Sequence, residues 1–408
     1  MNIAEMNRHR YLPYVRYAAR AMNRQRGLTL VELMVAMLIS SFILIGLVQI
    51  FATNRITYQA DEGLARLQEN GRFAIDFLVR DIRMAGNMGC LGKIPPDDQN
   101  NVWNYLDTTS PAYNLSTGIN GFEATGTAPG ATFAMPSMYP SPTNVYATTP
   151  ALDPLLVPGA IQGTDVLAVR FMDGEAVSLV PNAGGKYHDS AQVFAGTPNT
   201  LAQGDIVMVT NCKQVAIFQI TNNPTGGSPM NIAHGNGGSP GNTCPVWGTG
   251  SCKGYDNAFQ AGSQIAVLRS RFFFIGRQTR GTSANLGPSL FRRDANVGQP
   301  TELVEGIENM QILYGVDNNI QNDTGKDGHG ADSYLRADQV TNWSRVVSVR
   351  IGLLVSTSNT TEQTVNVGQS ADDTNDTSTY TVAGVTLDPV DDRRRRRVFT
   401  TTIGLRNL

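Results

Sequence analysis

The chain has 408 residues, of which 41% are hydrophobic, and its charged residues nearly balance at a net charge of −2. This length allows one to three domains with sizeable cores, and a pI of about 6.1 argues against a general nucleic-acid binder. The first 27 residues hold six arginines and one glutamate, a net charge of +5, so the remaining 381 residues carry −2 − 5 = −7.

Residues 28–52 form an apolar stretch in which Glu32 is the single charged residue. A helix of about 20 apolar residues is long enough to span a bilayer. The apolar part of a cleaved secretory signal is shorter and ends in a small-residue cleavage site, which this stretch lacks. The basic flank before it predicts a cytoplasmic N-terminus. We therefore expect a transmembrane helix, with the bulk of the chain outside the cytoplasm.

Glu32 is costly in hydrocarbon unless it lies at headgroup depth or meets a positive partner. Headgroup depth is the simpler interpretation. In the alternative, the chain is cut after Gly27, and Leu28 becomes a new N-terminus four residues before Glu32. A neighbouring helix of the same kind could then offer its terminal amine to Glu32. The apolar helix would serve assembly as well as anchoring.

The helical pattern continues beyond the apolar stretch. Between residues 53 and 87 the apolar positions recur at steps of three and four, which predicts an amphipathic helix. The chain has no proline between residues 28 and 94, and Gly86 and Gly89 are plausible stop signals. One helix should therefore run from Leu28 to about Ala85. Its apolar stripe comprises Leu64, Leu67, Gly71, Ala74, Ile75, Leu78 and Ile82, and its polar face comprises Arg66, Glu69, Arg72, Asp76, Arg80 and Arg83.

All four cysteines follow the apolar stretch, and would therefore lie in an oxidising compartment that favours two disulfides. Cys244 and Cys252 are close in sequence and would clip a loop, leaving Cys90 to join Cys212. The sequence leaves three pairings open. A zinc site is the weaker alternative, because no CxxC spacing occurs.

Beyond Cys90, residues 95–160 are rich in Pro, Thr, Ser, Gly and Asn and indicate long loops. Further Gly/Ser/Asn-rich stretches cover 221–262, 281–300, 318–335 and 357–377. Between these, alternating runs rich in β-branched and aromatic residues predict strands. The run 301–317 is ambiguous, and we expect a strand from Glu308. The clearest strand runs are DVLAVRF, DIVMVTNC, VAIFQIT, QIAVLRSRFFFIG, RVVSVRIGLLVST and RVFTTTIGL.

Four weaker features suggest chemistry. Gly237–Gly241 matches G-x-S-x-G around Ser239, but a hydrolase elbow needs a strand before it and a helix after it. Asp317–Asp332 is rich in the oxygen ligands that calcium prefers, yet lacks EF-hand spacing, so a polar loop is expected. The run Arg393–Arg397 is interpreted as an edge strand protected by charge, in preference to a patch that binds nucleic acid or lipid. We expect the loop histidines to be solvated: His188, His234 and His329.

The segment RGLTLVELMVAM resembles the class III signal of type IV prepilins, which joins a basic leader ending in glycine, an immediate apolar run and a glutamate at mature position five. The resemblance implies that prepilin peptidase cuts between Gly27 and Leu28 and that Leu28 is N-methylated. It also implies that Glu32 docks a subunit into a growing filament. Such leaders are often about six residues, so Met22 is a second candidate start.

Several later segments are similar to the minor pilin PilW family: RFAIDFLVRDIRMAGNMGCLG, VTNCKQVAIFQIT, LVEGIENMQILYGVD, VVSVRIGLLVST and RRRRRVFTTTIGLRN. The resemblance implies a non-enzymatic protein without cofactors that joins other minor pilins (PilV, PilX, FimU and PilE types), a PilY-type tip adhesin and the major pilin. It would help to prime pilus assembly from the bacterial inner membrane, with its bulk in the periplasm, and reach the pilus tip. It implies no nucleic-acid partner.

Together these features predict an α+β fold of the pilin and pseudopilin kind, with a long N-terminal helix packed on an antiparallel β-sheet domain. The expected parts are a leader (1–27), a transmembrane helix half (28–52), an amphipathic helix half (53–87) and an extracytoplasmic β-rich domain (88–408). A type II secretion minor pseudopilin of the J type is the first alternative. A membrane-anchored hydrolase using Ser239 is the second.

Overall fold

The computed structural model describes residues 29–91, 102–106, 111–113, 117–136, 146, 152, 156–189, 191–197, 200–244, 247, 252, 258–277, 287–295, 298–318, 330–357, 378–389 and 394–406. Contacts divide the chain into two units, the first ending at Tyr58 and the second beginning at Gln59. Each unit is described by itself below.

The long helix α1 spans Leu30–Met84 and contributes to both units. In the second unit its apolar stripe is turned inward, with Leu67, Ala74, Leu78 and Ile82 almost fully buried, while the expected charged face is exposed. The helix ends where Gly86 adopts a positive φ of 73°, a conformation that glycine takes without steric cost. The predicted helix is confirmed over Leu30–Met84.

The largest sheet in the described residues has eight strands, and all its pairings except β1 with β8 are antiparallel. Its path runs β1-β8-β7-β10-β11-β12, and β4 pairs with both β10 and β2. The strands are β1 (Val102–Asn104), β2 (Ile119–Phe122), β4 (Val166–Ser178), β7 (Ile206–Thr210), β8 (Val215–Gln219), β10 (Gln264–Arg277), β11 (Pro288–Asp294) and β12 (Thr301–Glu305).

A second, antiparallel sheet has the order β14-β13-β15-β18. Its strands are β13 (Ile307–Val316), β14 (Ser333–Leu335), β15 (Val346–Ser356) and β18 (Arg396–Gly404). Two small three-stranded sheets complete the described strands. One comprises β3 (Thr132–Ala134), β16 (Tyr380–Val382) and β17 (Val385–Asp388), and the other comprises β5 (His188–Asp189), β6 (Gln192–Ala195) and β9 (Met230–Ala233).

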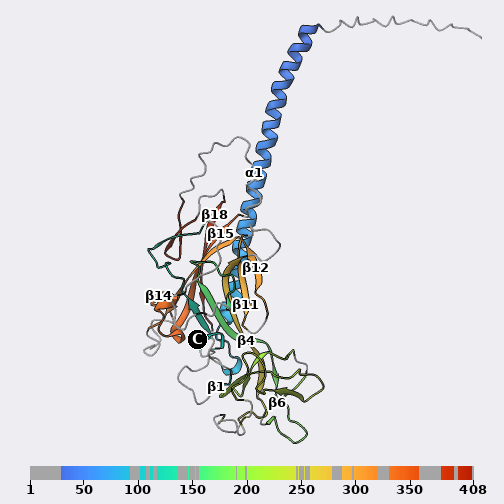
Figure 1. Ribbon diagram of the computed structural model, residues 1–408, viewed down its shortest axis with the longest axis vertical. Coiled ribbons are helices and arrows are strands. Elements are labelled where there is room, and N and C mark those ends of the chain that lie inside the picture. Colours follow the sequence, from blue (N-terminus) through green and yellow to red (C-terminus); the bar gives the residue numbers. More distant parts are fainter. Residues whose placement is uncertain are drawn as a thin grey trace, which may run out of the picture. The chain divides into compact units, whose positions relative to one another are not determined.

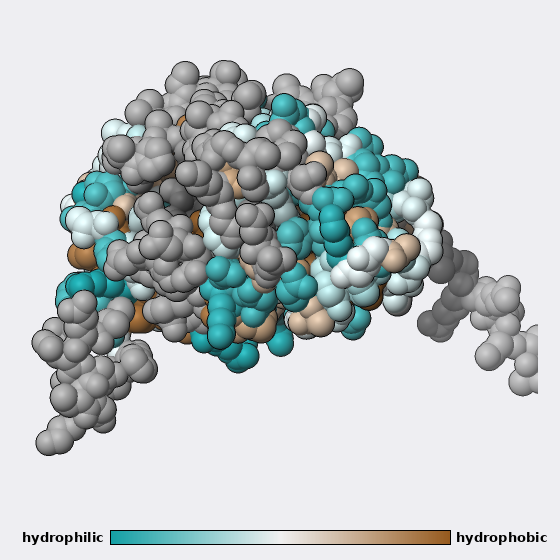
Figure 2. Space-filling view, turned by 90° about the horizontal axis from the view of Figure 1, so that it is seen from below, coloured by the Kyte–Doolittle hydropathy of each residue, from teal (hydrophilic) through white to brown (hydrophobic). Residues whose placement is uncertain are grey.

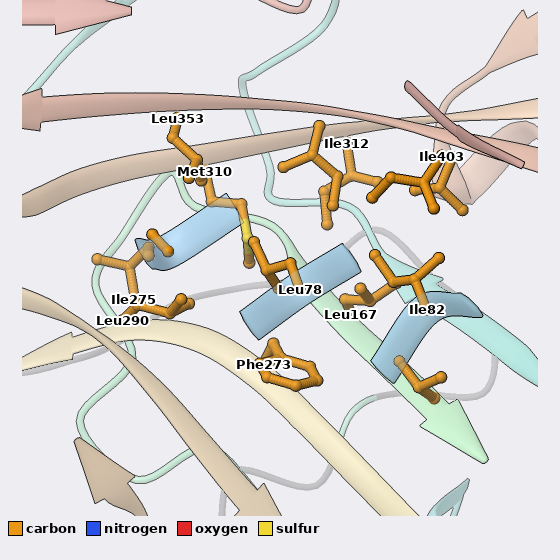
Figure 3. Packing of buried hydrophobic residues seen from close by; sticks show 14 of the residues in the cluster. Leu78, Ile82, Leu167, Phe273, Ile275, Leu290, Met310, Ile312, Leu353 and Ile403 are labelled. Atoms are coloured by element: carbon orange, nitrogen blue, oxygen red, sulfur yellow. The ribbon is translucent and has the colours of Figure 1, made fainter. Parts of the chain in front are cut away.

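The second half of α1 lies between the eight-stranded and the four-stranded sheet, and this layer holds the main core (Figure 3). Leu78 lies between Phe273 of β10 on one side and Met310 of β13 on the other. Within the second unit, β15 and β18 lie toward one end, and β1 and β6 lie toward the other (Figure 1). The α+β class and the helix-on-sheet packing predicted from the sequence are therefore confirmed.

Some expected loops contain strands. The loop-like stretches 95–160 and 281–300 hold β1, β2, β3 and β11, and the stretches 221–262 and 318–335 hold β9 and β14. The ambiguous run forms strand from Thr301, not only from Glu308. Cross-strand pairing explains these errors. β11 ends in three charged residues, yet its Leu290 and Phe291 are buried against neighbouring elements. The burial of a short strand depends on partners that are distant in sequence.

The arginine run is expected to protect an edge strand with solvent-exposed charge, and only part of the run is exposed in this way. β18 is an edge strand in the described residues, as expected, and Arg395 and Arg397 are exposed. Glu308, however, is buried on β13 and accepts hydrogen bonds from Arg394 (3.1 Å) and from Arg396 (2.7 Å). A buried carboxylate is stable only when paired. Two arginines of the run therefore hold β18 onto β13 internally.

Candidate functional site: the long helix and its fastening

The first turn of α1 is closed by a reciprocal pair of residues, Thr29 and Glu32. The Glu32 backbone N–H donates to Thr29 Oγ1 (3.3 Å), and the Thr29 N–H donates to Glu32 Oε2 (3.0 Å). The Thr29 hydroxyl also donates to the same carboxylate oxygen at 3.0 Å. This is a capping box, which satisfies backbone N–H groups that a helix start leaves without partners.

The capping box gives Glu32 a local role that the sequence interpretation missed, although the T-x-x-E signal was readable at Thr29. Its carboxylate also lies at the helix start, where the partial positive charge of the helix dipole favours an anion. The cleavage residues Gly27 and Leu28 lie outside the described residues, so processing, methylation and the docking role of Glu32 stay predictions.

The first part of α1 presents apolar side chains in every direction. From Leu30 to Phe51 its large apolar residues are exposed within the described part of the chain, at fractions from 46% to 75%. This part of the helix is not buried in the described structure, and it is long and apolar enough to cross a membrane. A helix that is apolar all round belongs in a lipid or protein environment.

A second apolar feature interrupts the charged face of α1 in the second unit. Phe73, Phe77 and Met84 are 48%, 39% and 37% exposed, and they are the large apolar side chains found exposed among the described residues from Gln59 onward. Their spacing of four and seven residues puts them on one side of the helix. We call these three residues the α1 stripe. The sequence interpretation named only the charges around it.

The rest of the described surface does not gather apolar residues in this way. Figure 2 shows one end of the molecule, where hydrophilic residues predominate in the described part and hydrophobic ones are scattered. Single exposed apolar residues are normal on a protein surface, whereas an ordered apolar row indicates a contact surface.

The C-terminal end of α1 is tied to the eight-stranded sheet by several bonds. A disulfide joins Cys90 to Cys212, and a second joins Cys244 to Cys252, which is one of the three pairings that the sequence left open. The Gly86 N–H donates to the Arg170 carbonyl at 2.9 Å. The helix therefore ends in a covalently fixed connection to the sheet.

An ion-pair cluster adds to this fastening. Asp81 on α1 accepts two hydrogen bonds from Arg271 Nη1 on β10, at 3.2 and 3.1 Å, and Arg271 also reaches Asp173 and Asp294. Burial raises the pKa of Asp81, and the nearby Arg271 opposes that shift. For Arg271, burial lowers the pKa, but the three carboxylates outweigh it and leave the pKa raised.

Two carboxyl groups are buried side by side where β2 ends and β4 begins. Asp165 accepts backbone hydrogen bonds from Ala124 (2.9 Å) and from Ile312 on β13 (2.8 Å), so it joins the two large sheets. Burial raises the pKa of Asp165 to about 7. Burial and the charge of Asp165 raise the pKa of Glu123 to about 9, so Glu123 is protonated at neutral pH.

The structure corrects the expected environment of one histidine, His234. His234 is fully buried and stacks on Trp247, with ring centroids 4.1 Å apart, so it is not solvated as expected. Trp247 lies inside the loop closed by Cys244 and Cys252, and that clip explains the contact. Burial lowers the pKa of His234 to about 4. His188 is half-buried in β5, and His329 lies outside the described residues.

The hydrolase and metal interpretations gain no support from the described residues. Ser239 follows β9 in an irregular loop held by Gln219, whose side chain donates to the Ser239 carbonyl at 2.9 Å, and no helix follows it in the described stretch to residue 244. The described residues contain no group of three or more possible metal ligands. Most of the calcium candidate Asp317–Asp332, from 319 to 329, lies outside them.

Comparison with known proteins gives two family matches. Residues 22–48 match the model of the prokaryotic N-terminal methylation motif, and residues 272–407 match the model described as type IV pilus-assembly protein W. No curated protein and no solved structure matches the chain. The second match begins within β10 and takes in the whole four-stranded sheet.

The methylation motif and the apolar helix behind it define the class: this is a prepilin-like protein with an N-terminal membrane anchor. Within that class, residues 272–407 match the PilW family of pilus-assembly proteins, and the two matches together support a type IV pilus minor pilin. The family is one of pilus structure and assembly.

Proposed function

We propose that this minor pilin helps to prime type IV pilus assembly and enters a tip complex with other minor pilins and a tip adhesin. The observation that carries the proposal is the distribution of exposed apolar side chains, which in the described residues gather on α1. A membrane accounts for the first part of that helix. The α1 stripe lies in the second unit, beyond the apolar segment, and is suited to helix packing against a partner subunit.

The processing steps belong to the same proposal. Prepilin peptidase cuts after Gly27, Leu28 is methylated, and Glu32 then draws the subunit toward the others in the inner membrane, with the bulk of the chain in the periplasm. Mass spectrometry of the N-terminus, with and without the peptidase, tests the first step. An N-methylated Leu28 that depends on the peptidase is expected, and an intact leader would contradict the proposal.

The capping box allows the docking role of Glu32 to be separated from its local role. Glu32→Gln keeps a capping side chain, because glutamine serves in a capping box, but removes the charge. Thr29→Ala keeps the charge and removes the cap. We expect Glu32→Gln to lose incorporation into the complex and Thr29→Ala to retain most of it. Loss in the alanine variant alone would assign Glu32 to capping only.

The α1 stripe gives a second test with a matched control. Phe73→Gln with Phe77→Gln removes the apolar row, and Arg72→Gln with Asp76→Asn changes exposed charges on the same helix turns. Both pairs should leave the melting temperature nearly unchanged, since these side chains are substantially exposed. Co-purification of the other minor pilins (PilV, PilX, FimU and PilE types) should fall only in the first pair.

The partners distinguish this proposal from the type II secretion alternative. A PilW-type role predicts co-purification with a PilY-type adhesin and with the major pilin, and loss of piliation when the chain is deleted. Retained piliation with loss of protein secretion would favour a J-type pseudopilin.

A further inference from the structure

Among the described residues, the four-stranded sheet ends in a long edge strand, β18. β18 has nine residues and pairs with β15 alone among the described strands. The other edge strands described, β14, β12, β1, β2, β3, β16, β5 and β9, have five residues or fewer. Proteins normally keep edge strands short or interrupt them, because a long edge pairs readily with another strand.

The register shows which backbone groups face outward. At the two ends of the β15–β18 ladder, the Thr357 N–H donates to the Arg395 carbonyl, and the Leu405 N–H donates to the Val347 carbonyl. The pairing between them has no shift. In an antiparallel ladder, residues bonded to the partner alternate with residues whose N–H and C=O point away. Within Val398–Gly404, the outward residues are therefore Val398, Thr400, Thr402 and Gly404.

The composition of this edge suits strand addition. Val398–Gly404 carries no charge and no proline, and is rich in residues that favour strands. Thr400, Thr402 and Gly404 are exposed. The neutral segment thus offers backbone groups without the charges that usually guard an edge.

The charges at its ends indicate what kind of strand fits. Arg395 and Arg397 are exposed before the neutral segment, and Arg406 is exposed after it. A second copy of β18 paired antiparallel would bring the end that carries exposed Arg395 and Arg397 next to the end that carries Arg406 in the other copy, and like charges brought together are destabilising. A strand with acidic residues at its end would instead be attracted.

We propose that the free edge of β18 binds an extended, acidic-ended segment of a partner protein by β-strand addition. Backbone hydrogen bonds from the four outward residues give the affinity, and Arg395 and Arg397 set the direction in which the segment lies. If the partner is another pilus subunit, that identification rests on the proposed function. The binding mode itself does not.

The first experiment measures amide hydrogen exchange at single-residue resolution in the full chain, using a synthetic probe of seven alternating threonines and valines followed by two glutamates. Without the probe, the amides of Thr400, Thr402 and Gly404 should exchange fast, and that of Thr401 slowly. With the probe, the three fast amides should slow at least several-fold. Outward amides that are already slow, or that stay fast at saturating probe, would overturn the proposal.

Two proline variants separate strand addition from folding. Thr400→Pro removes an outward N–H and should leave the melting temperature nearly unchanged. The affinity for the probe should fall about fivefold to tenfold, because one hydrogen bond between the probe and β18 is lost. Thr401→Pro removes an N–H bonded to β15 and should lower the melting temperature. Unchanged probe binding by a folded Thr400→Pro protein would refute the outward assignment.

The charge argument is tested with the same probe carrying two lysines in place of the glutamates. The wild-type chain should prefer the acidic probe, and Arg397→Glu should abolish that preference, because the new carboxylate offsets the charge of Arg395. If the minor pilins co-purify with the chain but the outward amides stay fast in that complex, the pilus-partner identification fails while the proposed function stands. If no complex forms, the proposed function fails and the peptide results still decide the binding mode.

Discussion

Replacing Cys90 and Cys212 by serine should cost this protein much of its stability. The disulfide closes a loop with a sequence separation of 122, and Cys244–Cys252 closes one of 8. In the chain-entropy model the long loop contributes about 5 kcal/mol and the short loop about 2.5 kcal/mol. A domain is typically stable by about 5–15 kcal/mol, so the first loss approaches the whole margin.

Urea unfolding of the full chain in detergent, followed by tryptophan fluorescence and circular dichroism, measures both losses. Double serine variants avoid leaving a reactive thiol. The Cys90/Cys212 variant should lose roughly twice the free energy of unfolding lost by the Cys244/Cys252 variant, because the entropy of loop closure grows with loop length. Equal losses, or a larger loss at the short loop, would contradict the entropic reasoning and locate the effect in the folded state.

Three further predictions concern the stability effects of buried residues. Because the pKa of Glu123 rises from 4.5 to about 9 on folding, the folded state binds the extra proton, and stability should fall as pH rises from about 5 to 9; Glu123→Gln should flatten that slope in urea titrations. The pKa of His234 falls to about 4, so stability should fall as pH drops from about 6.5 to 4, and His234→Phe should weaken that dependence. Gly71→Ala should lower the melting temperature by an amount equivalent to about 1–3 kcal/mol, since a Cβ there would collide with the Phe399 ring.

The long helix could be predicted because its signals are local. The step of three and four residues from Leu67 to Ile82 describes one face of a helix, and the same residues are buried in the structure. The alternation in β15 and β18 was equally readable, and Phe399 and Ile403 do face the main core. In each case one element's own pattern carries the information.

The features that were missed depend on contacts between distant segments. Glu123 looks like an ordinary loop carboxylate until β2 pairs with β4 and buries it beside Asp165. His234 looks solvated until the disulfide loop brings Trp247 onto its ring. Glu308 is buried on β13 and meets its arginines only because β18, far along the chain, lies near it. No local pattern predicts these environments.

Three of the buried charged groups each lie where two structural elements meet. Asp81 lies where α1 meets the eight-stranded sheet, Asp165 lies where that sheet meets β13, and Glu308 lies where β13 meets the start of β18. Apolar packing of a helix between two sheets stabilises the layers but sets their register only weakly, because it has no direction. Hydrogen-bonded charges require defined geometry. We therefore infer that these three groups fix the register of the helix and the two sheets, and hence which face of α1 is left exposed as the α1 stripe.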